Sequence, residues 1–327
     1  AGGNAAVLKP SEMAKNIQAL LVEMINNEFE EELIHCIGGA VTESQMLLKL
    51  PFDFIFFTGS TAVGKMVMQN AAEHLTPVCL ELGGKSPCVV HVDADLEVAC
   101  RRIAWAKFYN SGQTCVAPDY IYVHKDIQNA FIEKMKVVIQ QFYGEEPKSS
   151  EDYGRIINER HFHRLLGLVD KAKVIAGGDY DDEQLYIAPT LLADVQWSDS
   201  IMQEEIFGPL LPILSYTDIP EVIQQINHQP KPLAAYFFAT DSQLTNEFVE
   251  KVNFGGSCIN DCMVQLAHLQ LPFGGVGPSG MGHYHGKWGF DTFTHKKSVV
   301  RKSTWGDLDV RYPPYSETKF GWFKKIF

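Results

Sequence analysis

The amino-acid sequence predicts an α/β protein made of two doubly wound domains. Short, almost uninterrupted apolar strands alternate with amphipathic helical segments, which is the pattern of a parallel sheet covered by helices on both faces. This alternation stops at Gly83-Gly84 and then begins again with a different spacing. The chain has 327 residues, enough for two such units with their own apolar cores.

Four strands are expected before Gly83, at residues 5–9, 32–37, 52–58 and 77–82. The first helix should begin at Ser11, a residue type that caps helix N-termini. Its apolar face would consist of Met13, Ile17, Leu20, Leu21 and Met24. Two further helices are expected at residues 42–50 and 62–75. The second carries an apolar four-residue repeat of Val63, Val67, Ala71 and Leu75.

After Gly84 each expected strand is followed by a helix. The strands are residues 86–92, 120–124, 211–216 and 233–239, and the helices are residues 95–109, 126–142, 220–227 and 242–252. A polar stretch at 144–160 indicates an excursion, and residues 264–300, rich in Gly, His and aromatics, indicate loop and extended strand. The expected domains are therefore 1–84 and 85–263, followed by a bridging segment at 264–300 and a C-terminal tail at 301–327.

Composition excludes several classes of function. A formal net charge of −12 argues against a nucleic-acid partner. No apolar run reaches bilayer length, and the first residues do not resemble a secretory signal. The seven cysteines are sparse and odd in number, which favours a reducing compartment such as the cytoplasm, and their spacing predicts no metal site. The aromatic and basic tail could lie on a membrane surface, with attachment to an internal membrane if an anchor follows Phe327.

Two motifs in the first domain suit a dinucleotide. A glycine-containing turn follows an apolar strand and opens a helix, where parallel sheets place phosphates; its residues are Gly59, Ser60, Thr61, Ala62, Val63 and Gly64. A plain strand-to-helix turn is an equal reading, because the motif is not GxGxxG. Lys9 and Glu12 lie at the mouth of the neighbouring strand and could bind ribose hydroxyls or a phosphate, or could simply be solvated charges beside a capped helix.

Two further residues suit covalent chemistry. Glu81 lies inside an apolar strand, where burial raises a carboxyl pKa and favours a base near neutrality, unless an ion pair satisfies it. Cys115 lies in the polar stretch SGQTCVAPD, whereas the other six cysteines have apolar surroundings. A nucleophilic thiol needs an electropositive, partly exposed setting. The local sequence leaves nucleophile and core residue equally open for Cys115.

These motifs together resemble the aldehyde dehydrogenase superfamily. LELGGKSP and SGQTCVAPD correspond to its glutamate and cysteine motifs, and LKPSE, FTGSTAVG, QEEIFGP and LPFGGVGPSGMG occur in the family's order. The stretches VACRRIAWAKF, GMGHYHGKWGFDTFTHKKSV and RYPPYS resemble the class 3 branch, which includes the fatty aldehyde dehydrogenases. The resemblance covers the chain from Ala1 to about Pro314.

The resemblance implies oxidation of aldehydes to carboxylic acids with NAD or NADP. It implies a Rossmann-like cofactor domain, a catalytic domain, and a homodimer formed through the bridging segment. Cys115 would be the nucleophile that forms a thiohemiacetal and then a thioester, and Glu81 would activate the hydrolytic water. The implied cofactor contacts are Lys9 and Glu12 at the adenosine ribose, residues 59–64 at the pyrophosphate, and Glu205 with Phe207 at the nicotinamide riboside. Phe273 would line the substrate tunnel.

One family motif has no counterpart in the sequence. A Trp-Asn-containing segment, whose side-chain amide completes the oxyanion hole, is not found before Lys9. We therefore expect an N-terminally incomplete copy, poorly soluble and nearly inactive when expressed alone. The rival functions are a cofactor-independent cysteine esterase and a non-catalytic, lens-type structural protein. The presence of both Cys115 and Glu81 counts against the structural role.

Overall fold

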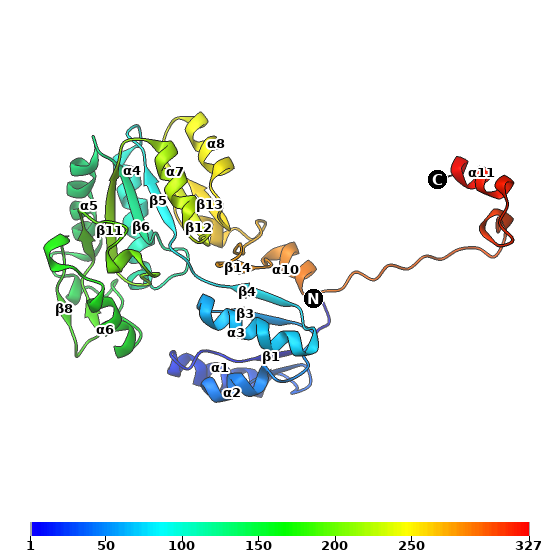
Figure 1. The fold of residues 1–327 in the computed structure, drawn as a ribbon. Helices are drawn as coiled ribbons and strands as arrows, with labels where there is room; N and C mark the ends of the chain where they lie inside the picture. Colours follow the sequence, from blue (N-terminus) through cyan, green and yellow to red (C-terminus); the bar gives the residue numbers. More distant parts are fainter. Residues whose placement is uncertain (1, 327) are drawn as a thin grey trace. The chain divides into compact units, whose positions relative to one another are not determined.

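The protein is described by a computed structural model of residues 2–326, whose contacts divide the chain into two units. The first unit runs to Thr294 and the second begins at His295. The largest sheet of the first unit has seven strands in the order β13-β12-β5-β6-β11-β10-β7 (Figure 1). All its neighbours are parallel except β10 and β7. The expected α/β fold class is confirmed.

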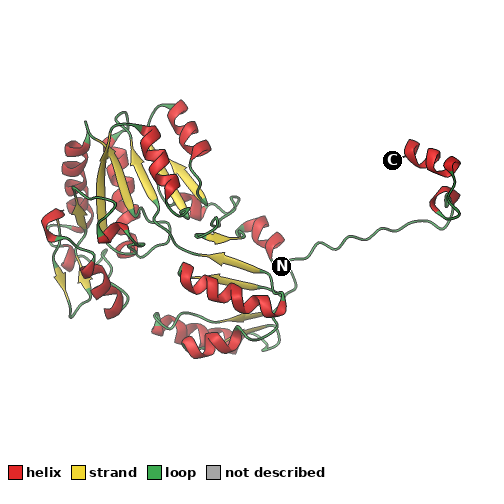
Figure 2. Ribbon diagram, viewed as in Figure 1, coloured by secondary structure: helices red, strands yellow, loops and turns green. Residues whose placement is uncertain are grey.

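The strands of this sheet are β5 Pro87–Val90, β6 Tyr120–His124, β7 Val174–Ala176, β10 Thr190–Leu192, β11 Leu210–Tyr216, β12 Ala234–Phe238 and β13 Gly256–Ile259. Its helices are α4 Leu96–Phe108, α5 Gln128–Tyr143, α6 Glu159–Gly167, α7 Ile219–His228 and α8 Ser242–Lys251. Helices and strands alternate around the sheet, as Figure 2 shows by colour.

Helices cover both faces of the seven-stranded sheet. Successive residues of a strand point to opposite faces, so each central strand contributes to two cores. On β12, Tyr236 and Phe238 pack into the core that α4 and α5 complete, whereas Phe237 packs into the core of α6, α7 and α8. Phe237 stacks on Phe248 of α8 with ring centroids 4.9 Å apart. Because both faces are buried, the strands are apolar throughout, which is the pattern that made them recognisable.

The four strands expected before Gly83 are present but belong to two sheets. Strands β1 (Ala6–Leu8) and β2 (Ile34–Cys36) form a parallel pair, and β3 (Ile55–Thr58) and β4 (Val78–Glu81) form another. Strand β14 (Gly280–Met281) pairs antiparallel with β4 and places Gly280 opposite Glu81. The segment after residue 264 thus supplies a strand next to a predicted catalytic residue.

The helices of this region are α1 Lys15–Glu28, α2 Val41–Leu47 and α3 Thr61–Ala71. The prediction that the first helix begins at Ser11 is wrong, because the Ser11 hydroxyl accepts a hydrogen bond from the Met13 N–H (3.2 Å) in a local turn. Three apolar residues of α1 are exposed rather than packed: Ile17 (55%), Leu20 (50%) and Met24 (53%). Leu75 is 89% exposed, because it follows a 3₁₀ turn in the left-handed conformation.

The sequence reading missed the shorter elements. Residues 264–300, expected as loop and strand, also contain helices α9 (Val264–Ala267) and α10 (Gly286–Thr292). Helix α6 follows the polar excursion, and a small hairpin forms from β8 (Tyr180–Asp181) and β9 (Tyr186–Ile187). Apart from α6, whose first residues lie inside the expected excursion, these elements have two to seven residues, too few for hydrophobic periodicity to stand out. The residue limits predicted for the domains stay a prediction.

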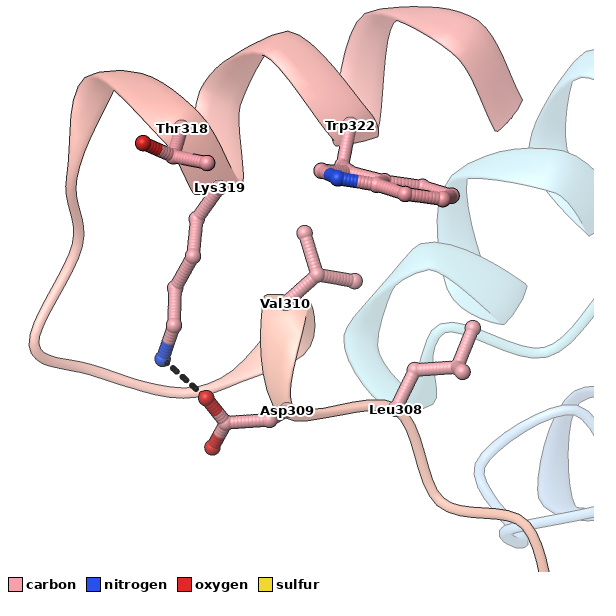
Figure 3. A pocket seen from close by; sticks show the side chains of 6 residues that line it. All are labelled: Leu308, Asp309, Val310, Thr318, Lys319 and Trp322. Carbon is pink, nitrogen blue, oxygen red and sulfur yellow. Dashed lines mark ion pairs between the residues drawn. The ribbon is translucent and has the colours of Figure 1, made fainter.

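The second unit contains a 3₁₀ turn at Asp309–Arg311 and helix α11 (Glu317–Ile326). Lys319 Nζ of α11 pairs with Asp309 Oδ2 at 2.8 Å. Figure 3 shows the shallow hollow beside this pair, which is lined by Leu308, Asp309, Val310, Thr318, Lys319 and Trp322. Among the residues that the structure describes, no helix combines the length and apolarity needed to cross a membrane.

Candidate active site

Cys115 lies in the loop that leads from α4 to β6. Asn110 and Ser111 take left-handed backbone conformations (φ 51° and 53°), and Gly112 follows with φ 74°. This sharp reversal leaves Cys115 only partly buried. The six other cysteines, all buried, are Cys36, Cys79, Cys88, Cys100, Cys258 and Cys262. Exposure therefore singles out the cysteine that the sequence motif marked.

Gln113 fastens this loop to the polar excursion. Its side-chain N–H group donates to the backbone carbonyl oxygens of Arg155 (2.9 Å) and Asn110 (3.1 Å). Its side-chain oxygen accepts from the Ile157 N–H at 2.9 Å. Nothing in the sequence reading pointed to this role, although Gln113 stands two residues before Cys115 in the quoted motif.

Gly112 is required by both its conformation and its surroundings. A methyl group at this position would lie 2.3 Å from the carbonyl oxygen of Gly208, with the backbone at φ 74°. We expect Gly112→Ala to lower the free energy of unfolding by about 2–4 kcal/mol, measured by denaturant titration. Gly144→Ala is the matched control, because Gly144 has φ 78° and nothing within 4 Å. It should cost less than Gly112→Ala, about 1–3 kcal/mol, because only the strain of its backbone (φ 78°, ψ −175°) opposes a side chain there. Equal losses in the two variants would show that the contact with Gly208 has no role.

Glu81 ends strand β4 and is 6% exposed. Neither oxygen of its carboxyl group has a hydrogen-bond partner, so the ion-paired alternative considered from the sequence is wrong. Burial raises the pKa of Glu81 to about 8. A buried, unpartnered carboxyl with this pKa is mostly protonated at pH 7 and becomes available as a base as the pH approaches 8.

The electropositive setting expected for Cys115 is not found. Burial, followed by the negative charges of Glu205 and Glu81, raises the pKa of the Cys115 thiol to about 11. The thiol therefore holds its proton at neutral pH, and a base or an added positive charge must favour the thiolate before attack. Glu205 and Glu81, the two acids whose charges help to raise this pKa, are both predicted site residues.

Glu205 and Phe207 lie in the loop between β10 and β11, after the 3₁₀ turn Ser200–Met202. The Glu205 carboxyl group lies directly over Gly83, where a methyl group would come within 2.0 Å of it. Burial, followed by the charge of Asp119, raises the pKa of Glu205 to about 7. Phe207 is 37% exposed with φ 49°, an unfavourable conformation for an aromatic residue. Such backbone strain is concentrated at functional sites.

The residues predicted to bind the adenosine end lie at strand ends of the first unit. Lys9 Nζ and Glu12 Oε2 form an ion pair of 2.8 Å just after β1. Ser60 caps α3 directly after β3, where unpaired backbone N–H groups favour an anion. Gly64 is buried, and a methyl group there would lie 2.5 Å from the Leu82 side chain, so its glycine serves helix–strand packing. Its contact with a pyrophosphate stays a prediction.

Phe273 is 6% exposed and bridges to Tyr284 through paired backbone hydrogen bonds. The two rings meet edge to face at 5.6 Å. Burial and the charges of Glu81 and Cys115 raise the pKa of Tyr284 to about 12, which places this aromatic pair beside the two predicted catalytic residues. The role of Phe273 in a substrate tunnel stays a prediction.

An NAD(P) dinucleotide fits the residues that are present. Gly83 leaves room for the Glu205 carboxyl group, and the Glu81 carboxyl group is buried without a partner. A capped helix N-terminus follows β3. In the described part of the chain no group of three or more His, Cys, Asp or Glu residues is arranged to hold a metal ion.

Comparison with known proteins gives the class to which this site belongs. The sequence pattern of the aldehyde dehydrogenase family matches residues 1–299. The 4,4'-diaponeurosporen-aldehyde dehydrogenase of Staphylococcus aureus is 48% identical over the whole chain, which spans 72% of that protein. Mouse aldehyde dehydrogenase family 3 member A2 is 49% identical, with 99% of this chain and 67% of the relative aligned. A rat "aldehyde dehydrogenase, dimeric NADP-preferring" is 52% identical, over 96% of this chain and 70% of its own.

The fold agrees with the sequence. A solved structure titled as the substrate-bound state of Staphylococcus aureus AldH superposes with a TM-score of 0.97 at 48% identity, covering 99% of this chain and 71% of its own. The chain belongs to the aldehyde dehydrogenase family. The predicted resemblance to the class 3 branch is confirmed by relatives of family 3 along the whole chain.

Proposed function

We propose that the protein oxidises aldehydes to carboxylic acids with NAD or NADP through a covalent intermediate on Cys115. The observation that carries this proposal is the pairing of the one partly exposed cysteine with a buried carboxyl that lacks any hydrogen-bond partner. Burial raises the pKa of Glu81 to about 8, which suits this carboxyl to take a proton from the water that hydrolyses a thioester on Cys115.

In this mechanism the Cys115 sulfur bonds to the aldehyde carbon and gives a thiohemiacetal. A bound NAD(P) would supply the acceptor for the hydride of this carbon, and the hydroxyl proton of the thiohemiacetal would pass to solvent. Cys115 then holds the acyl group as a thioester, and Glu81 takes a proton from the water that hydrolyses it. Glu205 and Phe207 would bind the nicotinamide riboside, and Phe273 with Tyr284 would shield the reacting carbon from bulk water.

The proposed cofactor is either NAD or NADP. The acid Glu12 disfavours a 2′-phosphate, yet its charge is paired with Lys9 at 2.8 Å, which weakens the repulsion. The rat relative's name describes a dimeric, NADP-preferring enzyme, which supports a homodimer and the use of NADP here. A cytoplasmic location agrees with seven unpaired cysteines. Exposed Phe320 and Trp322 beside Lys324 and Lys325 on α11 would suit contact of the tail with a membrane surface.

The proposal is tested by adding an aldehyde to the full-length protein with NAD or NADP. The near-ultraviolet absorbance of reduced nicotinamide should grow with time, and the carboxylic acid should appear in equal amount. A cofactor-independent cysteine esterase would instead cleave an ester and produce no reduced nicotinamide. Ester cleavage without any aldehyde oxidation, for either cofactor, would overturn the proposal.

A further inference from the structure

A buried ion pair contacts the loop that contains Glu205 and Phe207. It links this loop to the segments that follow Glu81 and Cys115. Lys85 follows Glu81 by four residues, and Asp119 follows Cys115 by four residues. Lys85 Nζ lies 2.5 Å from Asp119 Oδ2, and the side chains are only 14% and 5% exposed. Burying two charges is costly unless their hydrogen bonds are complete, so the contacts of this pair are informative.

The Lys85 ammonium group has no N–H left for a ligand. It donates to the Asp119 carboxylate and to the backbone carbonyl oxygens of Ile201 (3.0 Å) and Glu204 (2.8 Å). An ammonium group has three N–H donors, so all of them are used within the protein. Lys85 therefore acts on the loop around Glu205 and not on a bound molecule.

Asp119 holds the other side of the same loop. Its Oδ1 accepts a hydrogen bond from the backbone N–H of Ile206 at 2.9 Å, while its own N–H donates to the Ser86 carbonyl oxygen at 2.8 Å. Arg164 of α6 adds hydrogen bonds to the carbonyl oxygens of Glu205 (3.3 Å) and Ile206 (2.6 Å). The backbone is thus fixed on both sides of Glu205, immediately before the strained Phe207.

We propose that the Lys85–Asp119 pair is a positioning device for cofactor binding: it holds the loop of residues 203–208 so that Glu205 lies over Gly83 and Phe207 keeps its left-handed backbone. The pair also connects this loop to the segments that follow Glu81 and Cys115, because Lys85 and Asp119 each lie four residues after one of these residues. This inference rests on the proposed function, in which Glu205 and Phe207 contact the cofactor.

The test uses the double variant Lys85→Met with Asp119→Asn in the full-length protein. Both charges of the pair are removed together, so neither is left buried without the other, and the melting temperature should stay close to that of the unchanged protein. The amide of the introduced asparagine can still accept from Ile206, but the links to Ile201 and Glu204 are lost. We expect the dissociation constant of NAD or NADP, measured by calorimetry, to rise about 10- to 100-fold.

Two readouts separate positioning from general damage. Hydrogen exchange at the backbone amides of residues 203–208 should become faster without cofactor, while the rate of Cys115 alkylation should change less than about threefold. The matched control is Lys134→Met with Glu97→Gln, which removes another ion pair of 2.5 Å whose side chains are 38% and 55% exposed. The control should bind cofactor as the unchanged protein does.

Glu205→Gln distinguishes the two levels of the proposal. If Glu205→Gln weakens cofactor binding and the double variant does not, the positioning role is overturned and the proposed function stands. If Glu205→Gln binds cofactor normally, the assigned contact of this loop is itself overturned. Weaker binding in both variants, with unchanged melting and normal binding by the control, supports the positioning role.

Discussion

Replacing Cys115 by serine is expected to lower kcat/KM for aldehyde oxidation by about 10⁴-fold or more, because no covalent intermediate can form at a useful rate. A serine hydroxyl ionises less readily than a thiol, and burial with the charges of Glu205 and Glu81, which together raise the pKa of Cys115 to about 11, would disfavour an alkoxide further. The measurement is steady-state formation of reduced nicotinamide, with mass spectrometry of the intact protein to detect acylation.

Cys36→Ala is the control for this experiment, since Cys36 is 1% exposed on β2 and belongs to a different sheet. It should retain full activity, and its melting temperature is measured to show that the variant is folded. Alkylation of the unmodified protein adds a second readout. Because the pKa of the Cys115 thiol is raised, its reaction with iodoacetamide without cofactor should accelerate only at a pH well above that typical of a free cysteine. Full activity in Cys115→Ser would remove the basis of the covalent mechanism.

Replacing Glu81 by glutamine is expected to block hydrolysis of the acyl-enzyme while leaving its formation measurable. Steady-state turnover should fall about 10²- to 10⁴-fold, as is usual when a general base is lost. A first burst of reduced nicotinamide should be followed by slow turnover, and the acyl adduct on Cys115 should accumulate in the mass spectrum. Glu133→Gln, at a 72% exposed side chain, should behave as the unchanged protein.

The pH dependence gives the sign of the Glu81 effect. A base acts when deprotonated, and burial raises the pKa of Glu81 to about 8, so deacylation should speed up as the pH rises towards and past 8. Glu81→Gln should lack this limb of the profile. It should also make the Cys115 thiol more acidic, because one of the negative charges that raise its pKa is gone. An unchanged pH profile in Glu81→Gln would assign the proton transfer to another group.

The sequence motifs singled out Glu81 and Cys115 as candidate reactive residues because their local composition was unusual. Glu81 is the acid in an otherwise apolar strand, and its burial followed from that strand having both faces covered. Cys115 is the cysteine with polar neighbours, and it is the one that remains partly exposed. The long strands and helices of the seven-stranded sheet were predictable for the same reason, since their periodicity extends over whole elements.

The charge balance of the site could not be predicted from the sequence. Glu205 is separated from Cys115 by 90 residues in the chain (205 − 115), yet its charge is the first after burial to raise the pKa of the thiol. Likewise, Lys85 and Asp119 stand inside the quoted motifs, but their pairing beneath the Glu205 loop appears only in the folded chain. Burial and distance decide electrostatic strength, and both are properties of the tertiary structure.

By itself, the sequence determined the α/β fold class and the family, and it predicted two reactive residues, because each is encoded in local pattern and composition. The tertiary structure alone decided that the first four strands divide between two sheets and that β14, about 200 residues later, completes the edge beside Glu81. It also decided that Cys115 holds its proton and that a buried ion pair supports the Glu205 loop. These features depend on contacts between residues far apart in the chain, which no local pattern records.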